Sequence, residues 1–212
     1  MASYHTDEEQ VEALKRWWSE NGRSVVAGVI IGVGALVGWR GWTAYQNGQA
    51  NAASVHYAQL RAATLSDDAQ GIETATRVLQ ESYPSTPYAA LAALSLAKVK
   101  ADAGDLEASA AQLRWAAEHS SQEVVQAVAN LRLARVRVAQ GDNDAALTLV
   151  KGDFPAPYTS LVEEIRGDAY VAKGNLDAAR EAYDRALSAA AGGTEYLRMK
   201  RKNLGQAPES AS

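Results

Sequence analysis

The chain has 212 residues, of which 47% are apolar and 22% charged, and its formal net charge is −4. This composition is too apolar for a disordered chain and too charged for a polytopic membrane protein, and its acidic balance disfavours nucleic acid as a partner. The absence of Cys excludes disulfides, thiolate catalysis and Cys-ligated metal centres, and leaves the redox compartment open. With 43 Ala and five Pro, the sequence predicts an all-α protein.

The N-terminal region contains an uncharged apolar run at residues 24–39. Aromatic residues lie on both sides of it, as at the two interfaces of a bilayer: Trp17, Trp18, Trp42 and Tyr45. We therefore predict a transmembrane helix at 24–45, preceded by a cytoplasmic amphipathic segment at 1–23. A buried core helix is the alternative for the run. A cleaved signal peptide fits less well, because the 23 residues before the run carry five acids.

The orientation of this helix follows from the distribution of cations around it. Lys15, Arg16 and Arg23 precede the run, whereas Arg40 alone follows it closely. Because cytoplasmic flanks carry the excess of Lys and Arg, the N-terminus is predicted to be cytoplasmic. In a bacterium, the rest of the chain would then be periplasmic.

Small residues gather on one side of the predicted transmembrane helix, whereas Val, Ile and Leu dominate the other. Such a small face lets a second membrane helix approach closely. The sequence leaves open whether that helix belongs to a second copy or to another membrane protein. The residues predicted to pack there are Gly28, Gly32, Gly34, Ala35 and Gly38.

Three short turns after the predicted transmembrane helix share one pattern. In each, Asp or Asn directly follows a Gly, and Ala occupies the fourth position after that Gly. Their glycines, Gly104, Gly141 and Gly174, are 37 and 33 residues apart, close to the ~34-residue period of tetratricopeptide repeats. The Gly ends one helix in a left-handed conformation, and the Asp or Asn caps the next. Small or aromatic residues recur at matching offsets, where two helices touch or a gap is filled: Ala97, Ala134, Ala146, Gly167, Tyr170, Ala179, Tyr183 and Ala186.

These units predict a tetratricopeptide-like α-solenoid over residues 46–204. A degenerate unit with helices at 52–65 and 68–82 is expected before them. A basic capping helix at 195–204 is expected after them, and residues 205–212 are predicted to be a disordered tail.

The sequence shows no catalytic, cofactor or metal site. His5, His56 and His119 lie in different segments, and no P-loop, Rossmann fingerprint or nucleophile elbow occurs. The adjacent carboxylates at 67–68 and 163–164 are interpreted as solvated surface groups. We therefore predict a binding scaffold, and neither an enzyme nor a cofactor.

The binding surface is expected on the first helix of each unit, where stacked repeats form a concave groove. Its predicted residues lie six, ten and thirteen positions before each turn glycine, and they are apolar with cations in the first two units and acidic in the third. Such a groove suits an extended or helical polypeptide. The alternative is that its apolar members belong to the core. The predicted residues are Leu91, Leu94, Lys98, Val128, Leu131, Arg135, Leu161, Glu164 and Asp168.

Five stretches, which together span most of the chain, carry a family resemblance. They are 10–16 (QVEALKR), 20–22 (ENG), 32–40 (GVGALVGWR), 130–136 (NLRLARV) and 166–169 (RGDA). They resemble the YfgM family of ancillary SecYEG translocon subunits in the inner membrane of Gram-negative bacteria.

That resemblance implies a single-span protein with a cytoplasmic N-terminus and periplasmic tetratricopeptide repeats. It implies two partners, the SecYEG translocon and the membrane-anchored periplasmic chaperone PpiD, and a role in passing newly translocated proteins to chaperones. The alternative is a tetratricopeptide scaffold for another envelope assembly, with self-association as one form of it.

Overall fold

The computed structural model describes residues 7–204, which form helices and no strand. The first six residues and the predicted tail at 205–212 lie outside the described residues. The elements are α1 (Asp7–Leu65), α2 (Ala69–Ser82), α3 (Pro87–Asp102), α4 (Leu106–His119), α5 (Glu123–Ala139), α6 (Asn143–Leu149), the 3₁₀ turn η1 (Ala156–Tyr158), α7 (Thr159–Ala172), α8 (Leu176–Ala189) and α9 (Glu195–Asn203).

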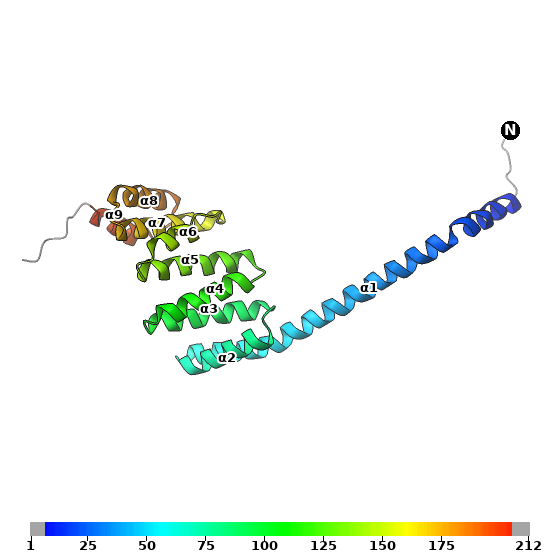
Figure 1. The fold of residues 1–212 in the computed structure, drawn as a ribbon, viewed down its shortest axis with the longest axis horizontal. Coiled ribbons are helices and arrows are strands. Elements are labelled where there is room, and N and C mark those ends of the chain that lie inside the picture. The colour runs from blue at the N-terminus through cyan, green and yellow to red at the C-terminus, as the bar shows by residue number, and fades with distance from the viewer. Residues whose placement is uncertain (1–6, 205–212) are drawn as a thin grey trace, which may run out of the picture. The chain divides into compact units, whose positions relative to one another are not determined.

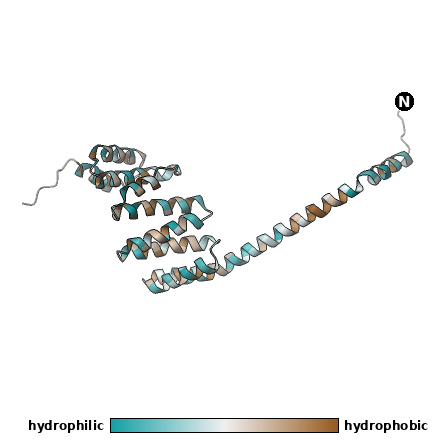
Figure 2. Cartoon of the chain, viewed as in Figure 1, coloured by the Kyte–Doolittle hydropathy of each residue, from teal (hydrophilic) through white to brown (hydrophobic). Residues whose placement is uncertain are grey.

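The chain divides into two compact units between Gln49 and Ala50, close to the sequence-based boundary at 46. The first unit consists of the N-terminal part of α1, which holds the apolar run (Figure 2). Among the described residues, α1 is the helix that is long and apolar enough to cross a membrane. The bulky side chains of the run are exposed, with Ile31 at 71% and Leu36 at 66%, as a helix that contacts lipid requires.

The separate helix expected at 52–65 is instead the C-terminal part of α1. No Pro occurs before Pro84, and the residues around position 50 are mainly Ala, Gln and Asn. Gly48 is the one strong helix-destabilising residue in this stretch, and a single helical Gly costs only about 1 kcal/mol. The helix therefore continues without a break from the predicted membrane span into the helix expected at 52–65.

In the second unit, α2 to α9 follow one another as a stack of antiparallel helices (Figure 1). Their core is a row of apolar clusters between successive helices, and it includes Leu60, Leu79, Leu113 and Ile165, all buried. Trp115 packs against two adjacent clusters and therefore joins neighbouring repeats. This arrangement confirms the predicted all-α array of helical repeats.

The turns between the two helices of each unit have the predicted geometry. Gly104, Gly141 and Gly174 have φ angles of +80°, +81° and +74°. The next residue in each turn accepts a hydrogen bond from a backbone N–H at the start of the following helix, over 3.1–3.3 Å. The left-handed Gly and the side-chain cap together end one helix and start the next.

A fourth turn of this kind joins α1 to α2, where Asp67 takes the place of the glycine. Its φ is +53°, and the Asp68 carboxylate accepts from the Gly71 N–H at 2.9 Å. Position 67 also precedes Gly104 by 37 residues, the spacing between Gly104 and Gly141. Asp68 is exposed, as interpreted, and its side chain also caps α2. Glu163 is instead 6% exposed and pairs with Arg166 and Arg185, so its interpretation as a solvated surface group is corrected.

Candidate protein-binding groove

The predicted binding surface lies on α3, α5 and α7, the first helices of the three complete units. These helices pack side by side, α3 against α5 and α5 against α7. We call the surface that they share the first-helix face. Helix periodicity places positions six and ten before each turn glycine on the same side of each helix.

Most apolar residues predicted for the groove contribute to packing. Leu131 is 1% exposed in the core between α5 and α7, so its assignment to the groove is corrected. Leu91, Val128 and Leu161 are half-buried and pack against core clusters. Leu94 is 8% exposed and combines both roles, because it belongs to the core and also lines a pocket.

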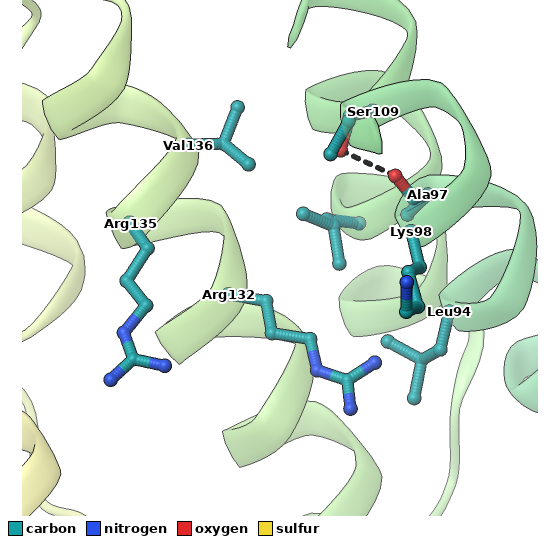
Figure 3. A pocket seen from close by; sticks show the side chains of 9 residues that line it. Leu94, Ala97, Lys98, Ser109, Arg132, Arg135 and Val136 are labelled. Atoms are coloured by element: carbon teal, nitrogen blue, oxygen red, sulfur yellow. Dashed lines mark hydrogen bonds between the residues drawn. The ribbon is translucent and has the colours of Figure 1, made fainter. Parts of the chain in front are cut away.

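That pocket lies between α3 and α5 and has a volume of about 260 Å³ (Figure 3). The lining brings together three predicted groove residues: Leu94, Lys98 and Arg135. Its other residues are mainly apolar and come from α3, α4 and α5: Ala97, Ala101, Ser109, Leu113, Arg132 and Val136. The Ser109 hydroxyl donates to the Ala97 carbonyl at 2.8 Å, so it is used within the fold.

The acidic part of the predicted groove is neutralised by α9. Lys200 Nζ donates to Glu164 Oε1 at 2.8 Å and to Asp168 Oδ2 at 2.7 Å. Arg135 reaches the other Glu164 oxygen at 3.3 Å, and the Tyr183 hydroxyl donates to Asp168 at 2.7 Å. The expectation of an open acidic surface in the third unit is therefore corrected, because these carboxylates have partners within the chain.

Two groups that bond to the carboxylates of this cluster, Lys200 and Tyr183, have raised pKa values. Burial disfavours the charged form of Lys200, but the hydrogen bonds to Asp168 and Glu164 outweigh it and raise the pKa of Lys200 above its ordinary value. Burial, followed by the hydrogen bond to Asp168, raises the pKa of Tyr183 far above its ordinary value. Both groups are therefore held in their protonated forms.

The helix that supplies Lys200 is fixed to the array at two further places. Leu197 and Leu204 pack in a cluster with residues of α8. Arg201 forms two hydrogen bonds to the Asp184 carboxylate, at 2.8 and 3.0 Å. The basic segment at 195–204 thus covers the last repeat, as expected of a capping helix.

The small residues predicted for membrane packing lie along the exposed part of α1. A Cβ added at Gly28, Gly32, Gly34 or Gly38 would meet nothing within 4 Å in the chain. Ala35 is also exposed. A second helix can therefore approach this face closely, and its role in packing stays a prediction.

Known proteins resemble this chain over nearly its whole length, both the apolar run and the repeats. The family model of the tetratricopeptide repeat-like domain matches residues 15–206, which include the apolar run. An ancillary SecYEG translocon subunit of Escherichia coli (strain K12) is 37% identical over 96% of this chain and 99% of its own length. Proteins of the same name from Haemophilus influenzae and Neisseria gonorrhoeae are each 30% identical over 96% of this chain and 100% of their own lengths. The chain belongs to the family of ancillary SecYEG translocon subunits.

Two residues at or near the groove were not predicted from the sequence. Arg132 lines the pocket, and it precedes the predicted groove residue Arg135 by one helical turn, so helix periodicity could have found it. Lys200 could not have been found in this way, because its partners are 32 and 36 residues distant in sequence.

Proposed function

We propose that this chain is a non-catalytic scaffold of the inner membrane that associates with the Sec translocon. One observation carries the proposal: relatives named as ancillary SecYEG translocon subunits align with almost the whole chain, anchor and repeats together. The repeat array supplies a surface for protein–protein contacts, as stacked helical repeats do in general.

In this scaffold, residues 24–45 cross the membrane, the N-terminus lies in the cytoplasm and the repeat domain lies in the periplasm. Lys15, Arg16 and Arg23 on the N-terminal side support this orientation against Arg40 on the other side. The exposed small residues between Gly28 and Gly38 are then the surface that packs against a transmembrane helix of the translocon.

We further propose that the first-helix face binds a periplasmic chaperone of the PpiD type and thereby links newly translocated proteins to chaperones. The pocket between α3 and α5 supports this role, because it joins an apolar floor to a charged rim. Binding sites of that construction hold a partner by burial and orient it by polar contacts.

The test is co-purification of the full chain from membranes in a mild detergent, followed by identification of the bound proteins. We expect translocon subunits and a PpiD-like chaperone to be recovered with it. Recovery of the translocon without a chaperone would contradict the chaperone link alone. A lone homo-oligomer would contradict the whole proposal and favour a self-associating scaffold of another envelope assembly.

A further inference from the structure

Ion pairs join neighbouring helices along the first-helix face. Arg135 on α5 pairs with Glu164 on α7 at 3.3 Å, and Lys200 on α9 pairs with Glu164 and Asp168 on α7. Within residues 7–204, no such pair joins α3 to α5, although both helices carry cations there. The pocket of about 260 Å³ lies at this step.

The rim of that pocket carries three cations whose partners differ. Lys98 pairs with Asp102 on its own helix, and Arg135 pairs with Glu164. Arg132 is exposed, and its guanidinium has no ion pair or hydrogen bond among the described residues 7–204. Figure 3 shows Arg132 extending from α5 towards Leu94 and Lys98.

The floor of the pocket is apolar, and its members come from three helices: Leu94 and Ala97 on α3, Leu113 on α4 and Val136 on α5. An apolar floor of this size holds one or two aliphatic side chains rather than a bare inorganic anion. The favoured ligand therefore combines an apolar side chain with a negative charge, and it is directed to this site by charge complementarity.

On α7, at the other end of the first-helix face, a charged residue is paired with a residue of α9. Positions 98, 135 and 168 are equivalent, since each lies six residues before its turn glycine. At Asp168, a cation reaches the first-helix face from a packed helix, because Lys200 of α9 bonds to this carboxylate. Positions 98 and 135 carry cations that pair with Asp102 and Glu164. Arg132 is the rim cation without a partner among residues 7–204, so its counterpart on a bound segment would be a carboxylate.

We propose that the pocket between α3 and α5 binds a polypeptide segment in which an apolar side chain is flanked by carboxylates. The apolar side chain enters between Leu94 and Val136, and the carboxylates pair with Arg132 and Lys98. This inference rests on the proposed function, because it names the chemistry of the partner that the repeat domain recognises.

The first experiment measures binding of labelled peptides to the full chain in detergent micelles by fluorescence anisotropy. The probe is a blocked 12-residue peptide with two leucines and three glutamates, and two matched peptides carry glutamine or lysine in place of glutamate. We expect the glutamate peptide to bind about tenfold more tightly than the glutamine peptide, and less tightly as salt screens the cations. Equal affinity for all three peptides would overturn the proposal.

Variants then locate the site. Arg132→Glu should weaken binding of the glutamate peptide at least tenfold, because it replaces attraction by repulsion. Arg114→Glu is the matched control, since Arg114 is an exposed arginine on α4 that does not line the pocket. Ala101→Leu, which adds bulk at the pocket wall, should also weaken binding, and unchanged circular dichroism would show that each variant is folded. Unchanged binding by Arg132→Glu would overturn the assignment.

Two other possible occupants of the pocket are distinguished by a deletion and by sedimentation. If residues 205–212 of the chain filled the pocket, their deletion would tighten peptide binding about tenfold. If a second copy filled it, Arg132→Glu would convert a dimer into a monomer in sedimentation. Either result would overturn the proposal. Co-purification with the translocon tests the proposed function separately. If the chain co-purified with the translocon but did not bind the acidic peptide, only this inference would be contradicted.

Discussion

Tyr183 on α8 occupies the space in which a side chain at position 167 of α7 would have to lie. A Cβ added at Gly167 would come within 2.3 Å of Tyr183 Cε1 and 2.5 Å of Cδ1. The ring is 3% exposed, and its hydroxyl is held by Asp168 at 2.7 Å. The absence of a side chain at Gly167 is therefore what lets α7 and α8 pack with this tyrosine between them.

The first prediction follows from this contact. Gly167→Ala should lower the free energy of unfolding by about 1–2 kcal/mol, because the cost of overpacking exceeds the gain of about 1 kcal/mol in helix propensity. Urea unfolding of the full chain in detergent micelles, followed by circular dichroism, measures the change. Gly152→Ala is the control, since a Cβ there meets nothing within 4 Å. Equal stability of Gly167→Ala and the parent chain would show that the ring moves freely.

The second prediction concerns the turn between α1 and α2. Asp67→Gly should raise the free energy of unfolding by about 0.5–1 kcal/mol, because a left-handed residue with a Cβ is strained and Gly is not. Gly104→Asp, the reciprocal change at an equivalent turn, should lower it by a similar amount. The same urea titration measures both variants. A loss of stability in Asp67→Gly would indicate that the carboxylate itself has a structural role.

The third prediction concerns Lys200, which lies largely buried among carboxylates with its side chain 18% exposed. Lys200→Met should lower the free energy of unfolding by about 2 kcal/mol, because Glu164 and Asp168 lose a partner in a partly desolvated site. Lys202→Met, at an exposed position on the same helix, is the control. If the two variants were equally stable, the cluster around Lys200 would contribute nothing to stability.

The fourth prediction gives the pH dependence of this cluster. The folded-state pKa values of Lys200 and Tyr183 both lie above their ordinary values. A group whose pKa is raised by folding contributes stability below its unfolded pKa, about 10 for both types, and loses it as pH rises further. The stability difference between the parent chain and Lys200→Met should therefore be constant from neutral pH to about pH 10 and shrink above it. A difference that grew with pH would contradict the pairing.

The fifth prediction concerns the anchor. Gly32→Leu and Gly38→Leu should reduce recovery of translocon subunits in mild detergent several-fold, because Leu prevents close helix approach at a small face. Val29→Leu and Val37→Leu change the opposite face and should leave recovery unchanged. Equal losses on both faces would contradict the assigned packing surface.

The chain contains no Cys, so single introduced cysteines can test the orientation of the predicted transmembrane helix. In spheroplasts, a membrane-impermeant maleimide should label Ser85→Cys but not Ser19→Cys, and should label both after permeabilisation. Both serines are exposed in the chain, so access depends on the membrane alone. The reverse pattern would place the repeat domain in the cytoplasm.

Local patterns account for the parts of the fold that were predicted correctly. The turns at Gly104, Gly141 and Gly174 need one left-handed residue and one cap, and both requirements fall on adjacent residues. The fourth turn was missed because Asp67 performs the task of Gly at some cost in strain. The continuity of α1 was also missed, because a change of composition near position 46 does not by itself end a helix.

The helical class, the turns and the apolar run could be predicted from the sequence, since each depends on residues within one or two helical turns. The repeat period followed from the recurrence of the same turn at Gly104, Gly141 and Gly174. The accessibility of the groove residues could not be predicted in this way, because it depends on contacts between helices. Leu131 is enclosed by α6 and α7, and Glu164 and Asp168 are paired with Lys200 from a helix more than thirty residues away in sequence. Burial and ion pairing depend on which helices meet, and the spacing of residues along one helix does not contain that information.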